Sequence, residues 1–284
     1  MTDATDVAHN PERPKGSWVF RCGLLLVGAH LFIAVLTLFW TPYDPLDLVG
    51  LRLEKPSLAH WLGTDRLGRD TLTQIMVGSR IAMIVGIGSV ALGAFIGVTI
   101  GLLAGFATRV WDDVLAAVLD ILIAFPVLLL AMLVVAASPQ PSLWTAVLAL
   151  GIAMSAIVAR LTRILVKRVL QNDYITASRC AGTGWVRLVW LHVLPNIWPF
   201  LAVNFALQFG MAIIAEASLS YLGLGAPLPN TSWGRLLQEA QGTVYTSPLG
   251  AIAPGVALVL LVIGANMFAD GLRDIADPTR RNER

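Results

Sequence analysis

Charged residues are scarce in this chain. Lysine, arginine, aspartate and glutamate make up 13% of its 284 residues, about half the share found in soluble domains. Hydrophobic residues make up 56% and gather in long continuous runs. These two features exclude an ordinary soluble protein. They predict an integral membrane protein of several helices, because a β-barrel would show alternating apolar and polar residues instead.

Cysteine and histidine are also rare. The sequence has two cysteines, Cys22 and Cys180, and four scattered histidines. No zinc-like cluster of these residues exists, so no metal site is predicted. Both cysteines fall within a predicted membrane span or on the side that the charge distribution assigns to the cytoplasm. A disulfide is not expected there.

Catalytic signatures are missing as well. The sequence contains no Walker-type phosphate loop, no His-Glu-x-x-His pair and no Gly-x-Ser-x-Gly turn. We therefore expect no enzyme activity, no cofactor bound by the chain itself and no nucleic-acid partner, and a membrane-bound scaffold or enzyme is disfavoured. If the chain takes part in active transport, the energy must come from a partner protein or from an ion gradient.

Six apolar stretches are present, each near the roughly 20 residues that cross the hydrocarbon core as a helix. The first has no small-residue cleavage site and is bracketed by Trp18 and Trp40, so we interpret it as an uncleaved span. The prediction is an all-α polytopic membrane protein with tails over 1–17 and 271–284 and a membrane core over 81–270. The six spans are 18–40, 81–106, 113–137, 143–165, 197–220 and 251–270.

Basic residues are unevenly distributed between the two sides. Of the 20 lysines and arginines, 14 fall in stretches that we place inside and the other 6 in stretches that we place outside. By the positive-inside tendency, both termini and the 166–196 loop are cytoplasmic. The 41–80 segment is then extracytoplasmic, and its equal numbers of acids and bases are typical of a folded, ion-paired element.

Within the 41–80 segment, the stretch 60–70 is rich in glycine and aspartate. Gly63 and Gly68 are free to take backbone angles that other residues avoid. Asp65 and Asp70 are suited to capping turns or pairing with arginines. Two interpretations stay open here: a self-stabilised loop without a ligand, or a surface that touches the substrate or a delivery protein.

The span over 81–106 carries glycines four residues apart. Such small-xxx-small spacing lets helices approach each other closely in lipid. It predicts either packing within this chain's own bundle or contact with a second, similar subunit. The glycines in question are Gly93, Gly97, Gly101 and Gly105.

Two ionisable residues and a proline stand inside predicted spans. Asp120 and Glu216 are costly at membrane depth and should face protein or a water-filled cavity. They predict a translocation path or gate, with Pro126 as a kink or hinge in the third span. The alternative is an interhelical cap, in which a carboxylate pairs with an arginine or a backbone group.

The stretch 172–196 is the longest part of the second half that is not membrane-like. It predicts a helix over 174–181, a break at 182–184 and a second helix over 185–193. Pro195 then stands near the start of the next long helix, where a missing N–H costs least. A structured helix-turn-helix between two spans suggests a docking surface for a partner outside the bilayer.

This stretch resembles the EAA motif of ABC-importer permeases, which reads Glu-Ala-Ala, a glycine after three more residues, and Ile-x-Leu-Pro. The resemblance implies a coupling helix that docks on a cytoplasmic ATPase. Arg179 and Arg187 are then candidates to pair with acids of the ATPase, although both also fit as solvated surface charges. The matching positions are Thr176, Ala177 and Ser178 for Glu-Ala-Ala, Gly182 for the glycine, and His192, Leu194 and Pro195 for the closing element.

Three further stretches, 60–80, 219–234 and 266–278, look like signatures of the dipeptide/oligopeptide/nickel group of these permeases. The start of the 41–80 segment and the single long first span are similar to the C-type subunit of that group. The resemblance implies the type I ABC-importer permease fold in the cytoplasmic (inner) membrane of a prokaryote, surrounded by the lipid bilayer. Selection of the substrate in such systems lies mostly in a separate binding protein.

The resemblance also implies partners. These are a homologous B-type permease, one or two ATPase subunits that bind ATP and Mg²⁺, and an extracytoplasmic substrate-binding protein that docks on 41–80 and 222–250. Di- or oligopeptides are the implied substrate, with nickel as the alternative. The alternative from another class is a gradient-driven secondary transporter that uses Asp120 and Glu216 as a proton relay.

Overall fold

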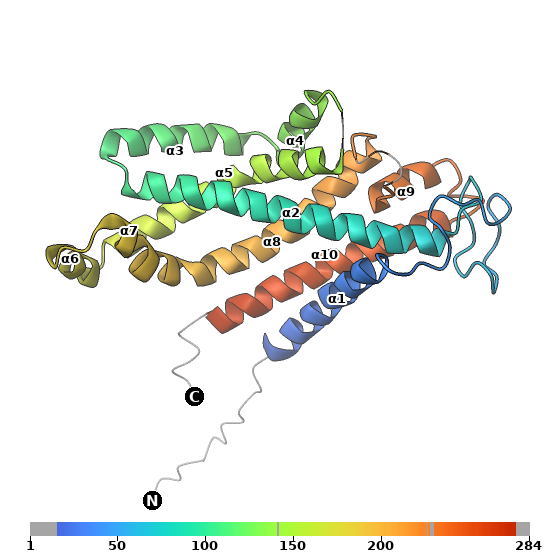
Figure 1. Ribbon diagram of the computed structural model, residues 1–284, viewed down its shortest axis with the longest axis horizontal. Helices are drawn as coiled ribbons and strands as arrows, with labels where there is room; N and C mark the ends of the chain where they lie inside the picture. The colour runs from blue at the N-terminus through green and yellow to red at the C-terminus, as the bar shows by residue number, and fades with distance from the viewer. Residues whose placement is uncertain (1–15, 141, 226, 228–229, 277–284) are drawn as a thin grey trace, which may run out of the picture.

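The computed structural model describes residues 16–276 except 141, 226 and 228–229, so the two predicted tails lie largely outside the described residues. In this part of the chain the regular secondary structure is helical, and the long helices run beside one another along the molecule (Figure 1). The prediction of an all-α polytopic fold is confirmed.

Among the described residues, five helices are long and apolar enough to cross a membrane. A sixth span is complete only if α3 (Arg109–Ala124) and α4 (Val127–Ala136) are taken together, because the two are bent by 87°. The five are α1 (Gly16–Leu36), α2 (Thr71–Phe106), α5 (Leu143–Leu170), α8 (Leu194–Tyr221) and α10 (Leu249–Ala276).

The bend between α3 and α4 has its cause in Pro126, which the sequence predicts as a kink or hinge. A residue before proline is driven out of the helical region. Phe125 accordingly has φ −80° and ψ 134°, and Pro126 itself is extended at ψ 130°. The third span is therefore broken into two helices rather than gently kinked.

The second span begins ten residues before the predicted start. Asp70 caps α2, because its carboxylate accepts a hydrogen bond of 2.8 Å from the backbone N–H of Thr73. The first turns include the polar residues Thr73 and Gln74, which are buried against protein. A hydropathy pattern misses such turns, since polar side chains paired inside the fold look unsuited to lipid.

The glycines of α2 pack within the chain's own bundle, the first of the two predicted alternatives. A Cβ placed on Gly97 would lie 2.6 Å from the backbone oxygen of Ser155 on α5. Gly93 and Gly101 face the same helix. The absence of side chains lets α2 and α5 approach closely along most of their length.

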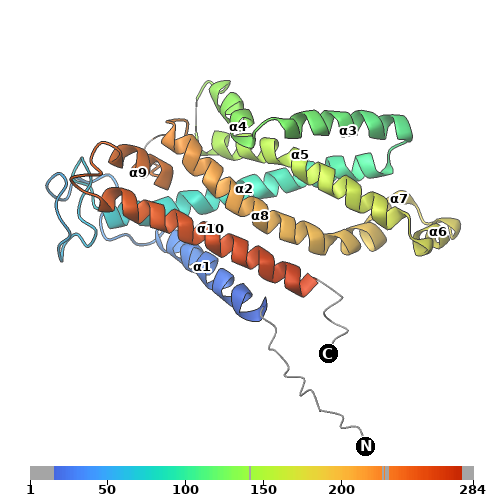
Figure 2. The same cartoon turned by 180° about the vertical axis from the view of Figure 1, so that it is seen from behind.

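The bundle has two distinct ends. Figures 1 and 2 show α6 (Asp173–Cys180) and α7 (Trp185–Leu188) at one end, and α9 (Trp233–Ala240) with the 41–70 loop at the other. We call these the α6 end and the α9 end. α1 lies along α10, where Phe20 stacks on Phe268 with ring centroids 5.3 Å apart. α1 begins and α10 ends on the side that faces the α6 end.

Candidate functional site

The turn after α6 depends on Gly182. Its φ of +80° lies in the left-handed region that glycine adopts without strain. Gly182 donates its N–H to the carbonyl of Arg179 (2.9 Å), and Thr183 donates to the carbonyl of Ser178 (3.1 Å). These two bonds form a Schellman cap that closes the helix and reverses the chain.

The second helix of this segment is not separate from the next span. α7 passes through a π-turn, η1 (Val189–Val193), directly into α8, so that one helix runs from Trp185 to Tyr221. Pro195 lies in the first turn of α8, as the sequence predicts. The carbonyl of His192 accepts a hydrogen bond of 2.6 Å from the side chain of Asn196. α7 is therefore a continuous extension of α8.

An apolar cluster holds α6 and α7 against the bundle. Ile175 of α6 is fully buried and packs with Leu188 of α7 and Val193 of the π-turn. The same cluster contains Val166 near the end of α5 and Ile197 in α8. Burying an isoleucine of this kind stabilises the contact by about 2 kcal/mol. The helix-turn-helix is thus packed against the ends of α5 and α8.

The residues that match the EAA motif come together at the α6 end. Ser178 donates a hydrogen bond to the hydroxyl of Thr183 (3.0 Å) and lies 3.4 Å from Nε2 of His192. Two departures from the motif, Ser178 and His192, are therefore neighbours. Leu194 packs against the apolar cluster. The remaining matching residues and both arginines are exposed: Thr176, Ala177, Arg179, Gly182, Arg187 and Pro195.

The surface around the turn is open. A Cβ placed on Gly182 or on Gly184 would meet no atom of the chain within 4 Å. Large apolar side chains beside the turn, those of Trp185, Val186 and Trp190, are also exposed. The predicted coupling residues thus share one surface that the chain itself leaves uncovered.

Among the described residues, no hydrogen bond or ion pair joins the predicted path residues to one another. Asp120 pairs with Arg160 (3.2 Å) on the outside of the bundle, where both side chains are more than half exposed. Glu216 is buried, and its carboxylate accepts a hydrogen bond of 2.6 Å from Ser220. Asp120 thus has the arginine partner that the interhelical-cap interpretation predicts. A role in a path stays a prediction for both residues and for Pro126.

One buried acid was missed by the sequence analysis. Asp112 of α3 is buried, receives a hydrogen bond of 2.6 Å from Nε of Arg163 and is paired with the ammonium group of Lys167. The spacing of acidic and basic residues in the sequence could have indicated this pairing. Asp112 and Asp120 are eight residues apart, and Arg160, Arg163 and Lys167 follow at intervals of three and four, so each set lies on one helix face.

At the α9 end, the 41–70 loop is stabilised by its own contacts, while a role in touching the substrate or a delivery protein stays a prediction. Gly63 and Gly68 have φ of +72° and +92°. The carbonyl of Gly68 accepts backbone hydrogen bonds from Val49 and Gly50. Asp65 pairs with Arg69, and Asp70 caps α2 while accepting a hydrogen bond of 3.0 Å from the ring of His60.

Residues 97–282 match the family of binding-protein-dependent transport system inner membrane components. The chain belongs to this family. Because the family consists of transport components, the chain is a non-catalytic subunit: a multi-pass permease of an ABC importer. Membership does not favour the gradient-driven secondary transporter that the sequence left open.

Three relatives cover most of this permease. A dipeptide transport system permease protein, DppC, of Alkalihalophilus pseudofirmus is 36% identical over 92% of this chain and 86% of the relative. A glutathione transport system permease protein, GsiD, of Pectobacterium atrosepticum is 40% identical over 89% and 86%. A di/tripeptide transport system permease protein, DppC, of Pseudomonas aeruginosa is 37% identical over 92% and 88%.

Proposed function

We propose that this permease imports di- or oligopeptides with energy from ATP. The names of the three relatives, which refer to dipeptides, di/tripeptides and glutathione, support peptides over nickel. The chain supplies half of a translocation path, and a homologous B-type permease supplies the other half. Asp120, Pro126 and Glu216 are the candidates to line or gate that path.

The uncovered surface at the α6 end carries the proposal. It lies on a helix-turn-helix whose second helix is continuous with α8 over 37 residues. An ATPase that docks on this surface moves α8 as a rigid body, since packed helices shift as units rather than bend freely. In this arrangement the α6 end and both termini are cytoplasmic, and two ATPase subunits with ATP and Mg²⁺ sit below the permease pair.

The α9 end then faces the outside of the cytoplasmic membrane. There the 41–70 loop and residues 222–250 receive the substrate-binding protein. Exposed large side chains on the loop, among them Leu58 and Trp61, support this because they lie outside the predicted spans.

Crosslinking from a native cysteine tests the assignment of the α6 end. Cys180 is exposed at the end of α6. With Cys22 replaced by serine, a thiol-directed photo-crosslinker on Cys180 should capture a protein that mass spectrometry identifies as a Walker-motif ATPase. A matched variant carries Cys22→Ser, Cys180→Ser and Leu58→Cys, which moves the probe to the 41–70 loop. Capture of the ATPase from Leu58→Cys, or failure to capture it from Cys180, contradicts the proposal.

A further inference from the structure

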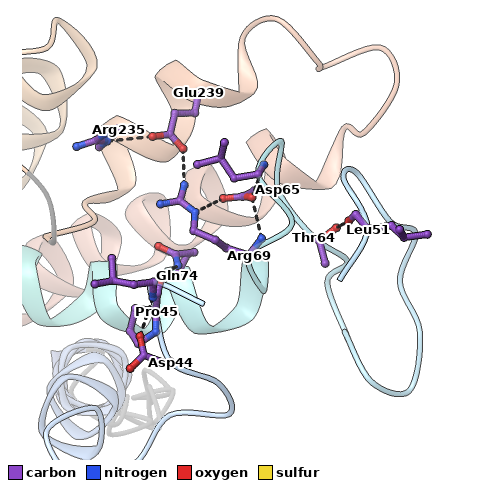
Figure 3. A network of polar contacts seen from close by, with 11 residues as sticks. Asp44, Pro45, Leu51, Thr64, Asp65, Arg69, Gln74, Arg235 and Glu239 are labelled. Atoms are coloured by element: carbon purple, nitrogen blue, oxygen red, sulfur yellow. Dashed lines mark hydrogen bonds and ion pairs between the residues drawn. The ribbon is translucent and has the colours of Figure 1, made fainter. Parts of the chain in front are cut away.

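Helix α9 is joined to the 41–70 loop by a chain of alternating charges (Figure 3). Arg69 donates to Asp65 through Nε (2.6 Å) and to Glu239 of α9 through Nη2 (2.8 Å). Glu239 also accepts a hydrogen bond of 2.9 Å from Arg235. The side chain of Arg69 is only 5% exposed, so salt screens the pair with Glu239 less than it screens a surface ion pair.

The Arg69–Glu239 pair connects segments that are 170 residues apart in sequence. A second contact supports it, because Nη1 of Arg66 donates to the backbone carbonyl of Glu239 at 3.4 Å. On the loop side, Arg69 immediately precedes Asp70, the cap of α2. The loop, α9 and the start of α2 are thus tied together at one place.

α9 is in turn fixed to the membrane helices. The indole N–H of Trp233 donates to the carbonyl of Ile75 on α2 (3.0 Å). Gly234 lies so close to α8 that a Cβ there would overlap the backbone of Ala217. Any displacement of α9 is therefore passed to α2 and α8.

We propose that Arg69 and Glu239 are a positioning pair that holds the 41–70 loop and α9 as one rigid platform for a docking partner. The inference rests on the proposed function in one respect, namely that the partner is the substrate-binding protein. The two residues do not need to touch that protein. They fix the relative position of the two surfaces that it contacts.

The chain offers a matched control. Glu239→Gln keeps the size of the side chain and removes the charge that both arginines contact. Arg235→Gln removes only the ion pair within α9, since Arg235 and Glu239 are four residues apart on the same helix. If the link between segments matters, the two variants differ. If only the stability of α9 matters, they behave alike.

The first measurement is a distance distribution between spin labels, made on the full importer complex in nanodiscs. Leu58 and Gln238 are exposed and lie on the loop and on α9. They are changed to cysteine after Cys22 and Cys180 are replaced by serine. The parent and Arg235→Gln should give one narrow distribution, and Glu239→Gln should give a broader one. An unchanged distribution in Glu239→Gln, or equal broadening in Arg235→Gln, overturns the proposal.

The second measurement is ATP hydrolysis by the unlabelled importer complex, with Leu58 and Gln238 unchanged, as peptide-loaded binding protein is added. In Glu239→Gln the half-saturating concentration of binding protein should rise about fivefold or more, the size of a typical coupling between sites. The maximal rate of ATP hydrolysis in Glu239→Gln should equal that of the parent. Arg235→Gln should match the parent in both the maximal rate and the half-saturating concentration. A lower maximal rate with unchanged half-saturation overturns the positioning role. If the parent complex shows no stimulation, the proposed function fails, while the label distances still decide whether the platform is rigid.

Discussion

A left-handed glycine makes a turn at each end of the bundle, but the surroundings of the two turns differ. Gly63, with φ +72°, is enclosed: a Cβ there would overlap the carbonyl oxygen of Glu54. Gly182, with φ +80°, has no atom of the chain within 4 Å of the same position. Both turns require a left-handed backbone, but Gly63 is tightly packed whereas Gly182 is open.

The difference shows that the chain covers the turn at the α9 end with its own residues and leaves the turn at the α6 end uncovered. At the α9 end, backbone hydrogen bonds and the partly buried Arg69–Glu239 ion pair join the loop to the helices, and the indole of Trp233 joins α9 to α2. At the α6 end, one apolar cluster around Ile175 holds the helix-turn-helix from behind and leaves its front uncovered. A surface of this kind is available to another protein without local rearrangement.

The largest effect is expected from filling the uncovered turn. The double variant Gly182→Trp with Pro195→Ala should abolish peptide uptake while membrane insertion, measured by immunoblot of membrane fractions, stays normal. The indole projects into space that the chain does not use, so it blocks a docked partner. Gly184→Trp is the sharper companion, because Gly184 has an ordinary φ of −66° and adds no backbone strain. Normal uptake in both variants would refute a docking role for this turn.

A matched pair of alanine variants tests the comparison of the two glycines directly. Both substitutions force a non-glycine residue into the left-handed region, at about 1 kcal/mol. Gly63→Ala adds the overlap with Glu54 and should lose about 3 kcal/mol in total. Thermal unfolding in detergent should therefore show a clearly lower midpoint for Gly63→Ala than for Gly182→Ala. Equal midpoints would mean that the close packing around Gly63 does not affect the stability of the variant.

The acids of α3 extend the comparison to ion pairs. Asp112 forms a buried ionic contact between α3 and α5 on the α6 half of the bundle. Asp112→Asn weakens its interactions with Arg163 and Lys167 and should lower stability by about 2 kcal/mol, less than for a fully buried pair since both cations are partly exposed. Asp120→Asn removes a more exposed pair and should cost under about 1 kcal/mol. The reverse order of unfolding midpoints would contradict this assignment.

The smallest effect is expected at Ser178. Its hydroxyl bonds Thr183 and lies near His192 across the turn, and Ser178→Ala should lower stability by about 1 kcal/mol or less. Ser218→Ala is a suitable control, since Ser218 bonds only its own helix at Ile214. Peptide uptake should fall modestly in Ser178→Ala and stay normal in Ser218→Ala. A loss of uptake as complete as that of Gly184→Trp would show that Ser178 contacts the partner directly.

The sequence by itself determined the class of the molecule and the place of its main features. Long apolar runs require helices in a membrane, because backbone polar groups in lipid must bond within their own segment. The glycine at 182 predicted a turn and the proline at 126 a bend, since both effects are local to the backbone. The motif-bearing stretch was therefore recognisable before any packing was known.

Only the tertiary structure decided which partners the polar residues have. That Asp112 meets two cations of α5, that Glu239 meets Arg69 and that α7 continues into α8 depend on contacts between segments far apart in the chain. Hydropathy also placed the start of α2 too late, because its first turns carry the buried polar residues Thr73 and Gln74, and Gln74 donates to the carbonyl of Pro45, 29 residues away. Local backbone preference fixes turns and helices, whereas burial and pairing are properties of the assembled bundle.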